Sequence, residues 1–238
     1  MNRISWLLPV VLAALVSGNV RAQEPVTKPQ LHVGDRWSFR NIDLQKNEEA
    51  QSYEIRVTDV VQDQITLIRK VISSNASTDV GKETTETVDA ATWTLHSPRI
   101  IEGKVVLLAF PLEVGKTWDY EYRTPSPYDA NGTTYKVTAK VEKWEDVKTP
   151  AGTFKALKVV HDSAWGQVLQ NTRQDVLWYV PRVKCYVKRE YVDRPLNGPV
   201  SANTRVELLK FDVRKVSTPR TGARPPASAR SGADARTK

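Results

Sequence analysis

One motif occurs twice in this chain of 238 residues and constrains its fold more than any other feature. Five residues recur in the same order, each shifted by 81 positions: Leu31, Val33, Gly34, Trp37 and Phe39, and then Leu112, Val114, Gly115, Trp118 and Tyr120. A segment of alternating apolar and polar residues follows each copy, at 53–58 and at 135–140. Recurrence at a fixed offset is typical of related structural units. We therefore expect two related β halves, at about 28–110 and 111–213.

Much of the chain also shows the two-residue period of β-strands. Tyr53, Ile55 and Val57 alternate with polar residues, as do Tyr135 and Val137 in the second half. This period is typical of strands, and turns that contain glycine or proline separate the periodic segments. We predict an all-β fold with few or no helices after the N-terminal segment. Its curved antiparallel sheet, of roughly eleven strands, is expected to form a half-barrel or an open barrel.

Residues 1–22 are typical of a cleaved signal peptide. Arg3 precedes an apolar segment at 6–16, and a small-x-small cleavage pattern ends at Ala22. A retained N-terminal anchor is the alternative. No cysteine lies near the cleavage point, so we expect no lipoprotein anchor, and no later segment approaches the ~20 apolar residues of a membrane span. The predicted location is therefore periplasmic or secreted.

The only cysteine is Cys185, so an exported chain of this sequence has no internal disulfide. Cys185 alternates with Val187 in a strand-like pattern. A small buried side chain is therefore favoured over a reactive thiol or a bridge between two chains. The core has to hold the fold together.

The formal net charge of +8 is concentrated in the C-terminal segment. Residues 214–238 contain seven basic residues and one acidic residue, and two arginines belong to the predicted signal peptide, so residues 23–213 carry no net charge. Prolines and the lack of aromatic residues predict a disordered basic tail at 214–238, after a single β domain at 23–213. The tail could attract an anionic polymer or lipid, or could simply be solvated. Nucleic acid is not an expected partner, because no aromatic residue is present for base stacking.

Deleting residues 217–238 is expected to leave the thermal unfolding temperature nearly unchanged, because a disordered tail makes no packing contacts. The same deletion should weaken binding to anionic surfaces, and the difference should shrink as salt is added. Thermal unfolding followed by circular dichroism, and binding measured at low and high salt, test the two statements. A large fall in the unfolding temperature would show that the tail packs on the β domain.

Three segments of the second half resemble the TapB-like and related domain-of-unknown-function families of exported bacterial β proteins. They are PLEVGKTWDY at 111–120, PAGTF at 150–154 and WYVP at 178–181, and the resemblance covers about residues 111–192. It implies a curved all-β sheet outside the cytoplasm. Some such domains are similar to the half-barrels of periplasmic lipoprotein carriers, which hold acyl chains in a concave apolar face. Those carriers cover the barrel with helices, which are not recognisable here, and the families supply no catalytic residues.

The sequence contains no recognisable catalytic or metal-binding pattern. The histidines, His32, His96 and His161, are far apart and lack the spacing of metal ligands. His161, Asp162 and Ser163 have the residue types of a triad, but neighbouring residues on a strand point to different faces. No nucleophile elbow, phosphate loop or dinucleotide fingerprint occurs. We predict a protein that is not an enzyme and that uses no metal or cofactor.

Aromatic side chains are the candidate ligand-binding residues. Bulky rings on strands could line an apolar cavity; the candidates are Trp37, Phe39, Trp118, Tyr120, Tyr122, Trp144 and Trp178. Core packing is the alternative, and it is favoured for Trp37 and Trp118 because a repeated motif usually preserves a packing unit. Trp144 stands between two charged residues, which is typical of a rim position.

A second candidate site is cationic. Arg182, Lys184 and Lys188 stand at even spacings, which predicts one strand face that could contact an anionic group. The alternative is a solvated or edge-strand face, where lysine discourages aggregation.

Three hypotheses for function follow. The first is an exported protein that binds an apolar or lipidic ligand in its concave face, or a protein partner at the cell envelope. The second is a structural or assembly accessory of the envelope, with a filled core and no ligand. The third is a hydrolase with an unrecognised site, which requires a polar cleft with grouped carboxylates or a histidine.

Overall fold

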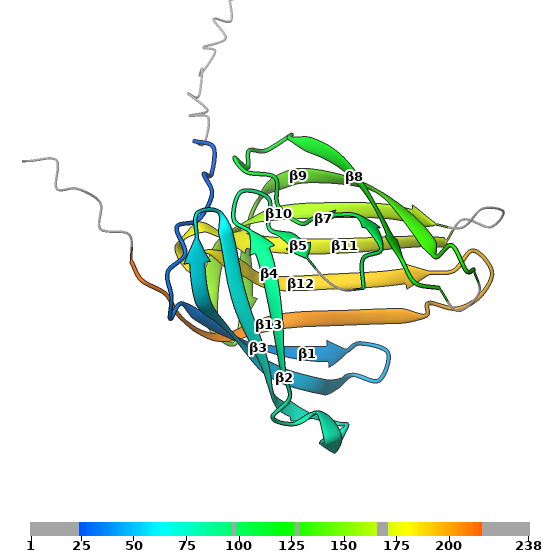
Figure 1. The fold of residues 1–238 in the computed structure, drawn as a ribbon, viewed down its shortest axis with the longest axis horizontal. Coiled ribbons are helices and arrows are strands. Elements are labelled where there is room, and N and C mark those ends of the chain that lie inside the picture. Colours follow the sequence, from blue (N-terminus) through cyan, green and yellow to red (C-terminus); the bar gives the residue numbers. More distant parts are fainter. Residues whose placement is uncertain (1–23, 97–98, 127–128, 166–170, 216–238) are drawn as a thin grey trace, which may run out of the picture.

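The fold is seen in a computed structural model that describes residues 24–96, 99–126, 129–165 and 171–215 (Figure 1). The predicted signal peptide and almost all of the predicted basic tail lie outside the described residues. Among the residues that are described, no helix has the length and apolar character needed to cross a bilayer.

The described chain is almost entirely β-structure. The strands of the first half are β1 (Arg36–Asp43), β2 (Glu48–Val61), β3 (Gln64–Ser74), β4 (Glu83–Asp89), β5 (Thr94–His96), β6 (Glu102–Gly103) and β7 (Val105–Val106). Those of the second half are β8 (Thr117–Thr124), β9 (Thr133–Thr149), β10 (Gly152–Trp165), β11 (Asn171–Val180), β12 (Cys185–Arg194) and β13 (Ala202–Asp212). Two short 3-10 helices, η1 (Ser77–Asp79) and η2 (Pro181–Val183), are the helices of this described part.

All thirteen strands belong to one antiparallel sheet, in the order β6-β8-β9-β10-β11-β12-β13-β1-β2-β3-β4-β5-β7. Strands β6 and β7 have two residues each, so eleven longer strands remain, and the predicted all-β curved antiparallel fold is confirmed. Strand β13 pairs with β1, which joins the second half to the first. The two halves therefore meet in the middle of the sheet, and the strands furthest from this junction form the two edges.

The two edges come close together without forming a closed barrel. Strands β6 and β7 stand at opposite ends of the strand order, yet only Lys104 separates them in the chain. This segment crosses from β8 to β5, and Gly103 has a φ of 76° where a side chain would collide with the backbone of Glu121 in β8. On the other side, the indole nitrogen of Trp118 donates to the carbonyl oxygen of Val106, 3.1 Å away.

The curl of the sheet places part of the first half over the inner face of the second. Figure 1 shows β9 to β13 side by side, with β2, β3 and β4 crossing in front of one end of them. The apolar side chains between these two groups form one core cluster, which includes Trp37, Val57 and Leu67 from the first half and Leu157 and Leu177 from the second. Covering these side chains is the main stabilising contribution, because each fully buried large apolar side chain contributes roughly 1.5–3 kcal/mol.

The two copies of the motif adopt the same turn. Gly34 and Gly115 have φ values of 96° and 94°, a region that favours glycine. Their backbone nitrogens donate to the carbonyl oxygens of Val57 and Val141, at 3.0 and 2.9 Å. Each of these valines donates back to the residue after the glycine, at 2.9 Å in both copies. The repeated glycine is therefore explained by one turn geometry that fastens each approach segment to a long strand.

Candidate functional site

The seven predicted aromatic residues lie in four different places. Trp37 and Phe39 are in the core, with exposed fractions of 1% and 0%. The indole nitrogen of Trp37 donates to the carbonyl oxygen of Val183 at 2.8 Å, and the ring of Phe39 stacks on Tyr186 with centroids 5.2 Å apart. These contacts favour the core-packing alternative for both residues.

Trp144 and Trp178 lie on opposite faces of the second half. In the β9–β10–β11 register Trp144 is opposite Leu157, whereas Trp178 is opposite the next residue, Lys158. Trp144 packs partly buried against the core. Trp178 donates from its indole nitrogen to a Glu145 carboxylate oxygen at 2.6 Å. The structure therefore does not bring these two tryptophans into one site with Trp118.

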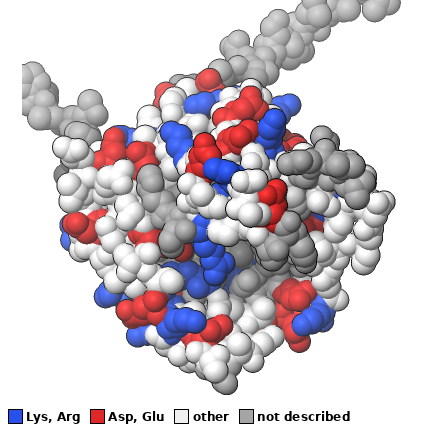
Figure 2. Space-filling view, turned by 45° about the vertical axis from the view of Figure 1, so that its right-hand side comes forward, with Lys and Arg blue, Asp and Glu red and all other residues white. Residues whose placement is uncertain are grey.

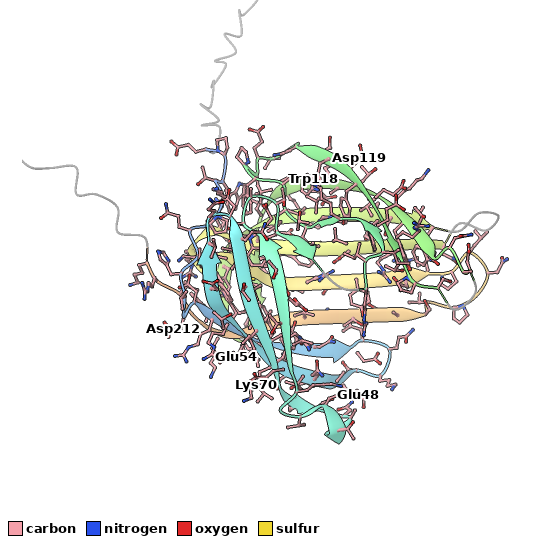
Figure 3. All side chains as sticks on the ribbon, viewed as in Figure 1. Glu48, Glu54, Lys70, Trp118, Asp119 and Asp212 are labelled. Atoms are coloured by element: carbon pink, nitrogen blue, oxygen red, sulfur yellow. The ribbon has the colours of Figure 1, made fainter. Side chains whose placement is uncertain are left out.

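Trp118, Tyr120 and Tyr122 do lie together, on the inner face of β8. All three side chains are half-buried. Figure 3 labels Trp118 on this strand beside Asp119, whose side chain belongs to the opposite face and accepts from the Thr138 hydroxyl at 2.6 Å. The alternation of β8 thus places its three aromatic side chains on one inner face.

The rings continue across β9 and β10 and form an aromatic row, defined by Trp118, Tyr120, Tyr122, Tyr135 and Trp165. Tyr122 stacks on Tyr135 with centroids 4.9 Å apart, and Tyr135 meets Trp165 at 5.1 Å. Cross-strand pairing aligns these three, because Tyr135 is opposite Tyr122 in β8 and opposite Trp165 in β10. Neither Tyr135 nor Trp165 is among the candidate ligand-binding residues that the sequence indicates.

His161 completes the row between Trp118 and Tyr120. Its ring lies edge-on to both, with centroid distances of 5.7 and 5.9 Å, and its Nδ1 is 3.1 Å from the Tyr120 hydroxyl. Only 2% of His161 is exposed. Burial lowers its pKa from 6.5 to about 4, because the imidazolium cannot be hydrated there. His161 is therefore neutral at neutral pH.

Two ion pairs lie beside the row on β11 and β12. Asp175, directly opposite His161, accepts from Nε of Arg189 at 2.9 Å and is only 8% exposed. Burial works against ionisation of Asp175, but the attraction of Arg189 outweighs it and lowers the carboxyl pKa. Arg173 pairs with Asp193, whose carboxylate raises the pKa of the Arg173 guanidinium. Both guanidinium groups and the Asp175 carboxylate are therefore charged at neutral pH.

Arg173 stands among three rings at the end of the row. Its guanidinium carbon is 5.9 Å from the ring centre of Tyr135, 5.6 Å from Trp165 and 5.7 Å from Tyr191. Cations are attracted to aromatic faces at such distances. Because Asp193 already neutralises Arg173, the surface exposes ring edges and a compensated charge.

A cavity of about 210 Å³ lies between the crossing strands and the second half. Tyr53, Arg69 and Trp93 line it from the first half, and Tyr186 and Arg189 from the second. Arg189 therefore borders this cavity and also pairs with Asp175 beside the row. Figure 2, in which the right-hand side of Figure 1 is turned forward, shows basic side chains in a hollow near the middle of that face.

The prediction that Arg182, Lys184 and Lys188 share one strand face is wrong. Arg182 lies in η2, and Lys184 follows it in the left-handed conformation, with a φ of 61°, so strand alternation begins only after them. Lys184 is buried and pairs with Asp35 at 3.0 Å. Lys188 pairs with Glu190 at 2.9 Å and lies over the ring of Trp178.

The reactive groups of the described residues are scattered. Cys185 is buried, which raises the pKa of its thiol and keeps it protonated. Among the described residues, no three His, Cys, Asp or Glu side chains are grouped closely enough to hold a metal ion. Asp162 accepts from Gln174 on the face opposite to His161, so the adjacent pair does not act together.

No protein-family model and no curated protein sequence matches this chain. The resemblance to TapB-like families is thus not confirmed. Among solved structures, a Bacteroides fragilis protein described as exported, with a YmcC-like fold, is 13% identical with a TM-score of 0.51, and the match covers 79% of this chain and 99% of that one. A Parabacteroides distasonis protein described as a lipoprotein is 14% identical over 80% of this chain and 100% of its own, with a TM-score of 0.45.

The Escherichia coli lipoprotein YmcC is 12% identical over 73% of this chain and 84% of its own, with a TM-score of 0.39. At these identities the likeness to the Bacteroides fragilis protein concerns the fold and says nothing of function. The chain therefore shares a YmcC-like all-β fold with a protein described as exported.

Proposed function

We propose that this chain is an exported, non-enzymatic protein that binds an apolar or lipidic ligand against the aromatic row. The observation that carries the proposal is the continuous series of rings from Trp118 to Trp165, with neighbouring centroids 4.9–6.3 Å apart. His161 in this series is buried, and the other rings are half-buried. Fully packed core rings would be covered, and free surface rings would be isolated. A contiguous and partly accessible aromatic surface on a concave face is typical of a binding site.

The charges beside the row favour an apolar contact rather than a free anion. Arg173 and Arg189 each have a carboxylate partner, so neither guanidinium is left to bind an anionic ligand without breaking a pair. Removing a partner from a buried charge is costly. The rings, in contrast, can bury an acyl chain or a flat apolar ring without displacing any charge.

The location outside the cytoplasm belongs to the same proposal. It rests on the predicted signal peptide at 1–22 and agrees with the descriptions of the structural neighbours as exported or as lipoproteins. Membership of the TapB-like families also remains a proposal, based on the three segments at 111–192.

An accessory protein of the envelope is the second candidate, and one observation favours it. The crossing strands fill the inner face at one end with core side chains such as Val57 and Leu67, so the concavity is only partly open. A protein of this kind would use its surface rather than an internal ligand.

Replacing Tyr122 by alanine is expected to weaken ligand binding about 5–30-fold, because a lost aromatic contact costs roughly 1–2 kcal/mol. The measurement is native mass spectrometry of the mature protein from its own cell envelope, followed by extraction and lipid analysis. The matched control is Trp144→Ala, which removes a half-buried ring away from the row. A bound lipid retained by the control and lost from Tyr122→Ala supports the proposal. Protein that is free of ligand under gentle conditions supports the accessory function instead.

A further inference from the structure

A groove lies at the end of the sheet where both ends of the described chain meet. Its volume is about 870 Å³, and residues 24–30 form one wall. The other wall consists of η2 and the end of β13, with Tyr179, Pro181, Phe211 and Val213 among its lining residues. Figure 1 shows that the described chain begins, in blue, and ends, in orange, on this same side of the molecule. We call it the termini groove.

The N-terminal wall is held in place by specific contacts. Val26 forms an antiparallel bridge with Leu112, whose side chain is fully buried, through backbone hydrogen bonds of 2.7 and 2.8 Å. Lys28 pairs with Asp63. An extended segment with these anchors forms a fixed wall beside the sheet.

Asp35 holds the opposite wall, and it does so from a buried position with only 1% exposure. Its carboxylate accepts from the backbone nitrogen of Arg214 at 2.7 Å, from the Lys184 ammonium at 3.0 Å and from the backbone nitrogen of His32 at 3.0 Å. The corresponding residue of the second motif copy is Lys116, which donates to backbone carbonyl oxygens instead. The first copy thus differs from the second at the residue that fixes this groove.

The lining of the groove combines apolar surface with unpaired positive charge. Five basic residues and one acidic residue, Glu24, line it. Lys28 and Lys184 are paired, but Arg182, Arg214 and Lys215 have no carboxylate within 4.0 Å among the described residues. All three are exposed, and Arg182 lies over the Phe154 ring at 4.7 Å.

We propose that the termini groove docks on the surface of an anionic phospholipid bilayer, with lipid phosphate groups at Arg182, Arg214 and Lys215. Basic residues near such a surface contribute about 1 kcal/mol each. In the sequence, five basic residues and one acidic residue follow Lys215 at 216–238. The apolar lining at Phe211 and Val213 suits the glycerol and upper acyl region of a lipid.

This docking is independent of the proposed ligand at the aromatic row. Tyr122, Tyr135 and Trp165 lie where β8 ends, β9 begins and β10 ends, which is the far end of these strands from the termini groove (Figure 1). A molecule held by the groove would present the open end of its concave face away from the membrane.

The test is co-sedimentation of the mature full-length protein with vesicles of phosphatidylcholine alone or mixed with an equal amount of phosphatidylglycerol. Binding is expected to the mixed vesicles only, and to decrease with salt. Replacing Arg182, Arg214 and Lys215 together by glutamate should weaken binding by about 100-fold or more, because each basic residue contributes about 1 kcal/mol near an anionic surface and glutamate adds repulsion.

The matched control replaces Lys136, Lys140 and Arg194 by glutamate. These exposed residues lie on β9 and β12 outside the termini groove, and the control has the same net charge as the groove variant. The control variant should bind within about threefold of the unmodified protein. Its substituted charges lie outside the groove, and charges more than a Debye length from the bilayer contribute little to the attraction. Equal losses in the two variants, or equal binding to both kinds of vesicle, would overturn the proposal, as would full binding by the groove variant. Circular dichroism confirms that both variants are folded.

Discussion

Replacing Asp175 by asparagine is expected to lower the free energy of unfolding by about 2–4 kcal/mol. Asp175 is 8% exposed and accepts three hydrogen bonds from Arg189, so the substitution leaves a guanidinium without its counter-charge on the inner face. The expected loss is at or below the range for fully buried pairs, because 30% of the Arg189 side chain reaches solvent. Urea unfolding at neutral pH, followed by tryptophan fluorescence, measures the difference.

Asp193→Asn is the matched control, because Asp193 forms the other ion pair on the same inner face. Its partner Arg173 also interacts with three rings, which remain in the variant. The two pairs are equally accessible, with side chains 14% and 31% exposed for Asp193 and Arg173 and 12% and 30% exposed for Asp175 and Arg189. We expect a smaller loss than for Asp175→Asn, about 1–2 kcal/mol, because the rings still attract the Arg173 guanidinium. If both variants lost the same amount, the rings would not compensate Arg173 for its missing carboxylate.

Strand alternation was sufficient to predict the fold class, and the same period explains why Trp118, Tyr120 and Tyr122 share one strand face. The period of two is a local property, so it can be read from successive residues in one strand. Which residue lies opposite in the next strand depends on register, and bulges change it, for example between Lys158 and Val159 in β10. Tyr135 and Trp165 could therefore not be assigned to the site from the sequence. The dipeptide Asn131-Gly132, which is typical of a hairpin turn, does indicate that β8 pairs with β9.

The repeated motif predicted one turn geometry for both copies but not the different environments of its tryptophans. Trp37 is on β1 in the middle of the sheet, where the crossing strands cover it. Trp118 is on β8, next to the edge, and stays half-buried. Strand order decides this difference, and strand order is a property of the whole chain rather than of the motif.

The positions of the cationic residues also could not be predicted from the local sequence. An even spacing from Arg182 to Lys188 was read as one strand, but Pro181 begins η2 and Lys184 adopts a left-handed conformation. Lys184 is then drawn inward by Asp35, a residue 149 positions earlier in the chain. Such a long-range ion pair leaves no local pattern, so a buried lysine looked like a surface charge.

The stability of the protein is expected to fall by up to about 3 kcal/mol between pH 6.5 and pH 4 because of His161. Its pKa is about 4 in the folded state, below the ordinary value of 6.5. In this pH window the unfolded chain therefore binds a proton that the folded chain does not, and the free energy of unfolding decreases as the pH falls. Protonation of Asp175 adds a further loss only at lower pH, because Arg189 lowers that pKa.

His161→Gln should flatten the dependence of unfolding free energy on pH between 6.5 and 4, measured by urea unfolding at several pH values. Tyr120→Phe is the control: it removes the hydroxyl that lies 3.1 Å from Nδ1 and costs about 1 kcal/mol at every pH. The slope should persist in that variant, because burial and not the Tyr120 hydrogen bond lowers the pKa of His161. If the pH dependence of the unfolding free energy were unchanged in His161→Gln, other groups would cause the acid sensitivity. Water would then reach the part of the aromatic row around His161.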